Sequence, residues 1–304
     1  MPIHPQAQAV LDLGKDDTFD YAAGAGAAAA VRQVMDTRAV AINATPPAVS
    51  RVEDRFIPGP GGPLRIRLYW PLQMPKGPLP IYVFFHSGGY VVYTVESADP
   101  QCRIVANAAQ CIVANVDYRQ APEAPAPAAA EDGIAAIAWL RTNAASLGGD
   151  PTRMAAGGES CGGTMASVAA IDARDRGLPQ LLEVVMVGPL VEMKLDSTVG
   201  GMAGWMRRMV VKNLDTPLDW RVSPLASADL KGLPPHLIIA GEFDGLRSQS
   251  EAYADKLKAA GAVATYHCVP GMIHNFTGMG GRIDAAHDSL ALIAKGLKAA
   301  FKTG

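Results

Sequence analysis

A serine lies at the centre of the stretch Gly158-Glu159-Ser160-Cys161-Gly162, between a short apolar run, Arg153 to Ala156, and a helical pattern, Thr164 to Arg174. A sharp turn from strand to helix strains the serine backbone and brings the two elements so close that only flanking glycines avoid a clash. The helix N-terminus points free backbone N–H groups at any negative oxygen formed there. These residues predict a serine hydroxyl that attacks a carbonyl carbon.

Such a serine needs a histidine to take its proton and a carboxylate to orient that histidine. We expect Asp244 as the carboxylate, because it follows the apolar strand pattern His236 to Gly241 and open parallel sheets bind ligands beyond their strand carboxyl ends. His274, in the loop after the alternating segment Ala264 to Val269, is the expected base. Glu242, two residues before Asp244, is an alternative carboxylate.

The remaining histidines have other expected roles. His86 opens the loop His86-Ser87-Gly88-Gly89-Tyr90 after the apolar strand pattern Ile81 to Phe85. Glycines there let backbone N–H groups approach a substrate oxygen. Structural positions in a terminus, two strands and the last helix are expected for His4, His236, His267 and His287.

Four ordered segments resemble the hormone-sensitive lipase family of α/β-hydrolases, the bacterial family IV esterases, from about Val52 to the C-terminus. They are the loop at His86, Asp117-Tyr118-Arg119-Gln120-Ala121-Pro122-Glu123, the turn at Ser160 and Trp220-Arg221-Val222-Ser223-Pro224-Leu225. The chain order of serine, acid and histidine is also that of α/β-hydrolases. The resemblance implies an α/β fold of the α/β-hydrolase type, with a mostly parallel eight-stranded sheet flanked by helices and a helical cap.

The same resemblance implies a role for each residue of the site. Ser160 is the nucleophile, His274 the general base and then acid, and Asp244 the orienting carboxylate. The oxyanion hole is formed by the backbone N–H groups of Gly88, Gly89 and Cys161. His86 is expected to shape its loop through hydrogen bonds. Paired buried charges that hold loops in place are expected at Asp117, Arg119 and Glu123.

Three positions depart from the family's usual motifs. Ser87 stands where the loop usually has its first glycine, Glu159 replaces an aspartate, and Cys161 replaces an alanine. A backbone N–H remains at position 161, since every residue except proline has one. The longer carboxylate of Glu159 is expected to reach a different partner.

Two segments interrupt the alternation of strands and helices. Residues 1–50 have a helical pattern, and residues 191–219 are rich in methionine. The resemblance implies that both belong to a cap, with the α/β-hydrolase core in residues 51–190 and 220–304. A half-exposed antiparallel strand is predicted for residues 63–70, with Leu64, Ile66 and Leu68 on one face and Arg65, Arg67 and Tyr69 on the other.

Methionine side chains at helical spacing indicate either packing against the core or a pliable wall for an acyl chain. The expected pocket residues are Tyr90, Met202, Trp205, Met206, Met209 and Ile273. The pair Arg207-Arg208 is expected on a solvated face.

Composition excludes several classes of protein. The chain has 304 residues, 49% of them hydrophobic, and a net charge of −2, which suits one large core and gives no sign of a nucleic-acid partner. Four scattered cysteines indicate neither a metal site nor a disulfide framework, and no cofactor is expected. The alanine-rich run before Val31 lacks a preceding basic segment and no apolar run reaches the length of a membrane span, so a cytoplasmic location is expected.

The sequence thus predicts a serine carboxylesterase that hydrolyses short to medium acyl-chain esters through an acyl-enzyme intermediate. Acyl transfer or amide hydrolysis by the same triad is an alternative, as is a non-catalytic ligand-binding protein of this fold, which the presence of His274 disfavours. A small-molecule ester is the expected partner. A homodimer paired through strand 264–269 and the final helix, 285–301, is also considered.

Overall fold

The computed structural model describes residues 2–15, 17–193, 201–211, 218–226 and 229–303. One sheet of eight strands runs through the molecule in the order β1-β2-β4-β3-β5-β6-β7-β8. The strands are β1 Arg51–Gly59, β2 Gly62–Trp70, β3 Leu79–Phe85, β4 Ile112–Val116, β5 Gly149–Glu159, β6 Val184–Val187, β7 His236–Gly241 and β8 Ala264–Val269. β2 is antiparallel to both neighbours and all other pairs are parallel, which confirms the predicted mostly parallel sheet.

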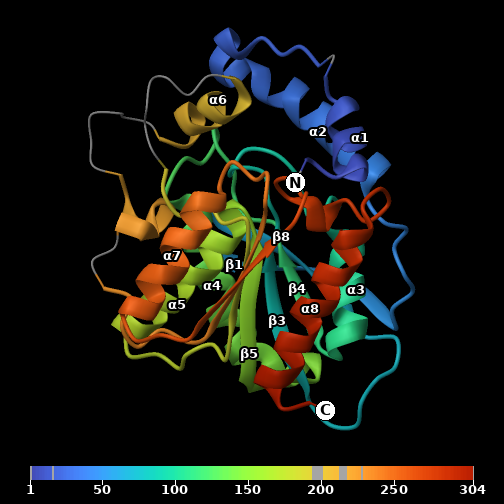
Figure 1. Ribbon diagram of the computed structural model, residues 1–304. Coiled ribbons are helices and arrows are strands. Elements are labelled where there is room, and N and C mark those ends of the chain that lie inside the picture. Colours follow the sequence, from blue (N-terminus) through green and yellow to red (C-terminus); the bar gives the residue numbers. More distant parts are fainter. Residues whose placement is uncertain (1, 16, 194–200, 212–217, 227–228, 304) are drawn as a thin grey trace.

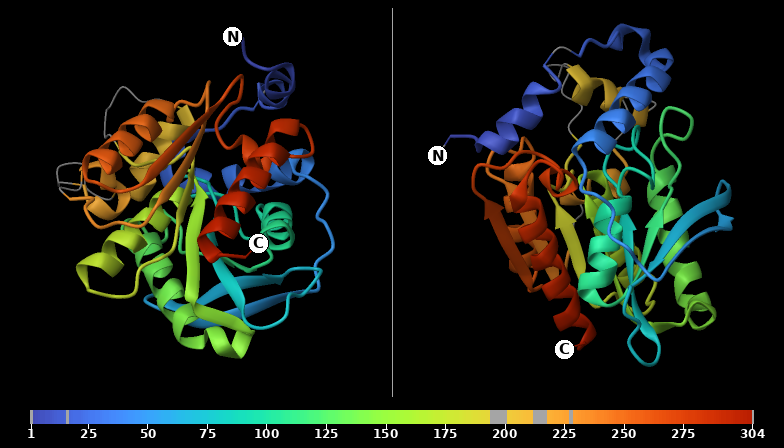
Figure 2. Two further views of the ribbon diagram at one scale, coloured as in Figure 1. Left: turned by 60° about the horizontal axis from the view of Figure 1, so that its bottom comes forward. Right: turned by 90° about the vertical axis from the view of Figure 1, so that its right-hand side faces the viewer.

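Helices cover both faces of the sheet (Figures 1 and 2). On one face lie α4 (Ala128–Asn143), α5 (Cys161–Asp175) and α7 (Arg247–Ala259), and on the other lie α3 (Asp99–Ala109) and α8 (Asp284–Phe301). Short 3-10 turns occur at η1 Tyr21–Ala27, η2 Ala144–Leu147, η3 Trp220–Val222, η4 Pro224–Ala226 and η5 Phe276–Gly278. Within the described residues, no helix combines the length and apolar character that a membrane crossing requires.

The central strand β3 explains why the core has two layers. All seven of its residues are buried. Ile81, Val83 and Phe85 point into the apolar cluster beneath α4, α5 and α7, whereas Tyr82 and Phe84 join the cluster beneath α3 and α8. Successive strand residues point to opposite faces, so a strand covered on both sides has a continuous apolar sequence.

The turn that carries Ser160 begins and ends closer to the serine than the sequence indicated. β5 runs from Gly149 to Glu159 and so ends three residues beyond the predicted end at Ala156, and α5 begins at Cys161 and not at Thr164. Gly162 and Gly163 therefore lie in the first turn of α5, where the helix is pressed against the sheet. By contrast, β7 and β8 have the predicted bounds.

One expectation for β2 is wrong. Leu64, Ile66 and Leu68 are buried as predicted, but Tyr69 on the opposite face is also fully buried. The guanidinium of Arg103, in α3, lies 5.8 Å from the centre of its ring. Alternation along a strand shows which residues share a face, but not whether a helix covers the second face.

Three helices gather at one end of the sheet, α1 (Pro5–Asp12), α2 (Ala28–Ile42) and α6 (Gly201–Val210), in the upper part of Figure 1. The indole Nε1 of Trp205 in α6 donates a hydrogen bond to the carbonyl oxygen of Gly24 at 2.8 Å, and its ring centre lies 5.9 Å from that of Tyr21. The N-terminal segment and α6 therefore pack against each other. Of the expected cap segment 191–219, residues 194–200 and 212–217 lie outside the described residues.

Candidate active site

Ser160 lies at the junction of β5 and α5 with a φ of 54°, in the left-handed region that is unfavourable for residues other than glycine. A Cβ atom at either Gly158 or Gly162 would collide with the carbonyl oxygen of Phe85, at the end of β3. The Ser160 N–H donates to the carbonyl oxygen of Val187 at 2.8 Å. The turn is thus held between the ends of two neighbouring strands.

The imidazole of His274 lies between Ser160 and Asp244. Its Nε2 is 3.1 Å from Ser160 Oγ, and its Nδ1 is 2.8 Å from Asp244 Oδ2. The Asp244 side chain is 1% exposed and that of His274 is 35% exposed, so the carboxylate is shielded from water more than the ring. The N–H of Leu246 donates to Asp244 Oδ1 at 2.7 Å and fixes the carboxylate in place. A hydroxyl, an imidazole and a carboxylate in this series can activate the hydroxyl as a nucleophile.

Gly188 lies against Asp244 and His274, although its sequence context did not draw attention to it. Its φ is 50°, and a Cβ atom there would lie 2.5 Å from Asp244 Oδ2 and 3.2 Å from His274 Nδ1. The position directly follows β6, where Val187 is followed by glycine and Pro189. A glycine–proline pair after an apolar strand pattern is the signal that could have indicated a special backbone position.

Asp244, and not Glu242, is the carboxylate next to His274. Glu242 accepts a hydrogen bond from the backbone N–H of Gly271 at 2.8 Å. The alternation that would bring both carboxylates to one side applies only within a strand, and β7 ends at Gly241.

His86 and Tyr118 hold the loop that follows β3. Their rings stack with centres 4.3 Å apart, and the Tyr118 hydroxyl donates to the His86 carbonyl oxygen at 2.9 Å. Burial lowers the pKa of His86 to about 4, so its ring is neutral near pH 7. The His86 Nδ1–H then donates to the carbonyl oxygen of Ser87 at 2.7 Å. His86 shapes this loop as expected.

The backbone next to Ser160 belongs to Gly88, Gly89 and Cys161. The two glycines line the cavity that contains Ser160 and have φ values of 115° and 58°. A Cβ atom at Gly88 would collide with the carbonyl oxygen of Val92. Cys161 begins α5, and burial raises the pKa of its thiol, whose Sγ is 3.5 Å from the Tyr118 hydroxyl oxygen. The buried thiol therefore packs beneath the loop as a neutral group.

A cavity of about 450 Å³ adjoins Ser160 and His274. Most of its wall is apolar and comes from Met35, Val92, Leu190, Met193, Met202, Met206 and Leu246. Of the six expected pocket residues, Met202 and Met206 line it. The other four lie elsewhere: Trp205 is fully buried against the N-terminal segment, Tyr90 and Ile273 are buried, and Met209 packs against the core. Arg207, expected on a solvated face, is among the lining residues.

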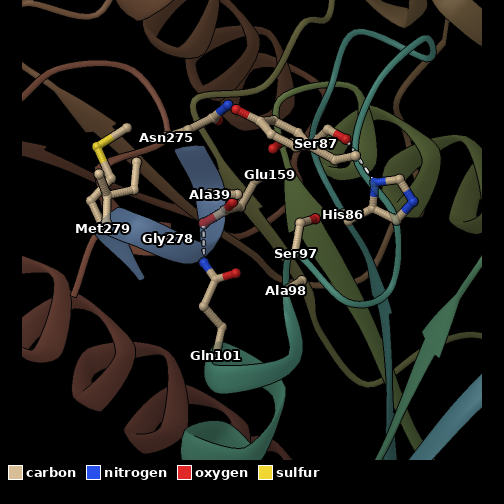
Figure 3. A pocket seen from close by; sticks show the side chains of 12 residues that line it. Ala39, His86, Ser87, Ser97, Ala98, Gln101, Glu159, Asn275, Gly278 and Met279 are labelled. Atoms are coloured by element: carbon tan, nitrogen blue, oxygen red, sulfur yellow. Dashed lines mark hydrogen bonds between the residues drawn. The ribbon is translucent and has the colours of Figure 1, made fainter. Parts of the chain in front are cut away.

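A smaller cavity of about 40 Å³, lined in part by Glu159 and Gln101, lies beside the site (Figure 3). The buried Glu159 accepts a hydrogen bond from Gln101 Nε2 at 2.6 Å and another from the hydroxyl of Thr277. Burial raises the pKa of Glu159, and these two hydrogen bonds oppose the rise. The expected different partner of this carboxylate is thus the loop that follows His274.

The charged residues Asp117, Arg119 and Glu123, which follow β4, are paired, but none of them is fully buried. Arg119 bonds the buried Asp132 at 2.9 Å, and Asp117 lies 3.2 Å from Arg65. Glu123 pairs with Arg32 of α2 at 2.7 Å although its side chain is 64% exposed. Asp117 and Arg119 are half-buried and Glu123 is exposed, so the expectation of burial is wrong for Glu123 and met only in part by the other two. Glu123 links α2 to the core at the surface.

The four other histidines lie apart from this series. The buried His236 has Nδ1 2.7 Å from the carbonyl oxygen of Pro234 and Nε2 3.3 Å from Ser167 Oγ, and burial lowers its pKa to about 4. His4 caps α1, His267 lies in β8, and the ring of His287 in α8 bonds the Gly280 carbonyl oxygen at 2.8 Å. Each has the structural position expected for it.

Comparison by sequence points to one group of enzymes. A family model described as an alpha/beta hydrolase fold matches residues 82–278, which include Ser160, Asp244 and His274. The chain is 36% identical over 278 residues to Carboxylesterase NlhH of Mycobacterium tuberculosis, covering 84% of this chain and 86% of that enzyme. It is 34% identical over 230 residues to an arylesterase of Saccharolobus solfataricus, covering 71% of this chain and 73% of the arylesterase.

Solved structures give the same result. A serine-to-alanine mutant of an alpha/beta hydrolase enzyme from the metagenome of Lake Arreo has a TM-score of 0.91 and 33% identity, with 99% of each chain covered. A hyperthermophilic esterase from the archaeon Pyrobaculum calidifontis has a TM-score of 0.87 and 32% identity, covering 98% of this chain and 99% of that one. The similarity extends over nearly the whole length of each chain.

Proposed function

Because the chain belongs to the hormone-sensitive lipase family of α/β-hydrolases, we propose that it is a serine carboxylesterase that works through an acyl-serine intermediate. The observation that carries the proposal is the hydrogen-bonded series of Ser160 Oγ, His274 and Asp244, at 3.1 Å and 2.8 Å, beside an apolar cavity. The names of the relatives, carboxylesterase and arylesterase, favour ester hydrolysis over acyl transfer or amide hydrolysis. A small-molecule ester is accordingly the substrate.

Acylation uses each member of this series in turn. His274 Nε2 takes the proton of the Ser160 hydroxyl as Oγ bonds the carbonyl carbon of the ester. Asp244 stabilises the imidazolium that forms and keeps the proton on Nδ1. Collapse of the tetrahedral intermediate breaks the bond to the alkoxy oxygen, which leaves as the alcohol with the proton from Nε2. The product of this half-reaction is an ester of Ser160.

Deacylation repeats the same steps with water as the nucleophile. His274 Nε2 removes a proton from a water molecule, whose oxygen bonds the acyl carbon. The Ser160 oxygen then leaves and recovers its proton from the imidazolium, which releases the carboxylic acid. One ester bond and one water molecule are consumed in each cycle.

The negative oxygen of both tetrahedral intermediates is held by the backbone N–H groups of Gly88, Gly89 and Cys161. Their position around Ser160 supports this role, and so does the N-terminal end of α5. Because these donors belong to the backbone, the thiol of Cys161 takes no part in the reaction.

Residues 1–50 and 191–219 form a cap over a core made of residues 51–190 and 220–304. The support is that Met35 of α2 and Met206 of α6 line the cavity together with core residues, and that Trp205 bonds the N-terminal segment. Thioether side chains adapt their shape to an acyl chain of short to medium length. A series of aryl esters of increasing acyl length tests this proposal, and a maximum at sixteen carbons would contradict it.

The assembly is a homodimer formed through β8. This strand lies at the edge of the sheet, where its backbone has hydrogen-bonding capacity on one side, and the adjacent Val263 is 64% exposed. The helix α8 packs against the neighbouring strand β7 and would contribute to the contact. Sedimentation velocity at micromolar concentration should give the mass of a dimer, and a Val263→Lys variant should shift it toward the monomer.

The location is cytoplasmic. Cys268 is a free thiol at the surface, and Cys102, Cys111 and Cys161 are free and buried. A reducing compartment preserves such thiols. Fractionation of the source cells beside a cytosolic marker enzyme tests the location.

The central test is the activity of Ser160→Ala on a short aryl ester. We expect kcat/KM to fall by several orders of magnitude, as when any member of a serine triad is removed. Ser146→Ala is the matched control, because the hydroxyl of this exposed serine donates to the carbonyl oxygen of Asn143, within its own turn. Near-normal turnover by Ser160→Ala would refute the proposed nucleophile.

A further inference from the structure

Two neighbouring arginines of α6 have different surroundings. Arg207 lines the cavity that contains Ser160 and His274 and is half-buried, whereas Arg208 is exposed and does not line it. The preceding residue, Met206, lies so close to Gly89 that a Cβ atom on that glycine would be 2.6 Å from its Sδ. This turn of α6 is therefore directly above the loop that follows β3.

Arg207 is the charged group of the cavity that has no partner among the described residues. Three other titratable groups line it: the phenol of Tyr93, and Asp244 and His274, which bond each other at 2.8 Å. The guanidinium of Arg207 makes no hydrogen bond or ion pair with any residue that the structure describes. A guanidinium carries five N–H donors in a planar fork, so this side chain offers the cavity a set of unused donors.

The surroundings of Arg207 favour the binding of an anion. Carboxylate groups match the fork of a guanidinium, often with two parallel hydrogen bonds. Thioethers and branched aliphatic side chains form most of the nearby wall, and a poorly hydrated environment strengthens such a charged contact. The net charge of the chain is −2, so any preference for an anionic substrate must come from a local cation.

We propose that Arg207 is a specificity residue that binds a carboxylate on the substrate, and that the substrates are therefore esters which carry a free carboxylate, such as half-esters of dicarboxylic acids. This inference rests on the proposed esterase function of the same cavity. Ser160 cleaves the ester group while the guanidinium of Arg207 holds the anionic end of the molecule.

The test compares monomethyl and dimethyl esters of succinic, adipic and suberic acid, which share each acyl chain and differ in charge. The rate of each diester is divided by two for its two equivalent ester bonds. For at least one chain length, Arg207→Gln should lower the ratio of kcat/KM for half-ester over diester about tenfold or more, the loss expected for a charge-assisted hydrogen bond. The change should lie mainly in KM, and Arg207→Lys should restore part of it.

A second arm places the carboxylate in the alcohol part, with the acetate ester of hydroxymethylbenzoic acid compared with benzyl acetate. It distinguishes which part of the ester faces Arg207. Arg208→Gln is the matched control, since it removes the same charge from the exposed neighbouring position and should leave every ratio unchanged.

The outcomes distinguish a failure of the proposed anion subsite from a failure of the proposed esterase function. If the enzyme cleaves the diesters but no ratio in either arm depends on Arg207, or if Arg208→Gln has the same effect, the anion subsite is refuted. If the wild-type enzyme cleaves neither these esters nor a short neutral aryl ester, the proposed function itself fails.

Discussion

The buried carboxylate of Glu159 accepts a hydrogen bond from the hydroxyl of Thr277, three residues beyond His274. Glu159 directly precedes Ser160, so this contact joins the backbone that carries the serine to the loop that carries the histidine. The separation of 3.1 Å between Ser160 Oγ and His274 Nε2 therefore depends on a contact outside the series of three residues.

Replacing Thr277 with valine should lower kcat by about tenfold to a hundredfold and change KM little, because small displacements of reacting groups reduce turnover without removing substrate contacts. Steady-state kinetics on a short aryl ester would measure this split. Thr142→Val is the control, since that hydroxyl donates to the carbonyl oxygen of Ala138 on the exposed side of α4. An unchanged kcat in Thr277→Val would show that Glu159 does not position the histidine loop.

A methyl group at position 188 should disable the site. In Gly188→Ala the new Cβ would lie 2.5 Å from Asp244 Oδ2, so the carboxylate must move away from His274. We expect kcat/KM to fall by about a hundredfold or more. Gly177→Ala is the matched control, because it has a φ of 64° but no atom within 4 Å of the added Cβ. This control should lose about 1 kcal/mol of stability and keep its activity, and equal activity of the two variants would refute the steric argument.

The two candidate carboxylates are distinguished by amide substitutions. Asp244→Asn should lower kcat by roughly 10⁴-fold, as in serine proteases, because an amide cannot stabilise the imidazolium or hold the proton on Nδ1. Glu242→Gln should keep near-normal kcat, since its carboxylate bonds the Gly271 N–H and not His274. A larger loss for Glu242→Gln than for Asp244→Asn would reverse the assignment.

A half-buried carboxylate far from the site should make stability depend on pH. Glu183 lies beneath α8, where a Cβ atom on Gly296 would be 3.3 Å from both of its carboxylate oxygens. Burial raises its pKa from 4.5 to about 7, so the folded protein holds this proton more tightly than the unfolded chain does. The stabilisation is complete below pH about 4.5 and is lost as the pH rises through about 7.

Glu183→Gln should therefore raise Tm at pH 8 relative to the wild type and make the change of Tm between pH 5 and pH 8 smaller. Thermal unfolding followed by circular dichroism measures both quantities. Asp255→Asn, at a side chain that is 79% exposed, should leave the profile unchanged. Parallel profiles for Glu183→Gln and the wild type would show that this carboxyl group is not the source of the dependence.

The sequence alone predicted that Ser160, Asp244 and His274 lie at one edge of the sheet. Each of these residues follows a predicted strand. The carboxyl ends of parallel strands lie at the same edge of a sheet, so the loops that follow them lie close together. The residues between strands and helices were harder to interpret. Gly188 makes its contact with Asp244 and His274 only after three separate strands are aligned.

The orientation of α6 could not be predicted from its own residues. A methionine-rich helix has several faces that look suitable for a cavity, and the rotation of the helix is set by Trp205, which bonds Gly24, 181 residues earlier in the chain. This contact turns Met202, Met206 and Arg207 toward the cavity and leaves Arg208 outside. Helical periodicity groups residues on a face but does not say which face meets which neighbour.

Covalent labelling with an aryl phosphonate ester tests the central claim most directly, because only a serine activated by its neighbours attacks such a reagent readily. Intact-mass spectrometry of the wild-type protein should show one adduct per chain, peptide mapping should assign it to Ser160, and Ser160→Ala should remain unlabelled under the same conditions. A wild-type protein that stays unmodified, or a Ser160→Ala variant that is labelled as fast as the wild type, would contradict the account.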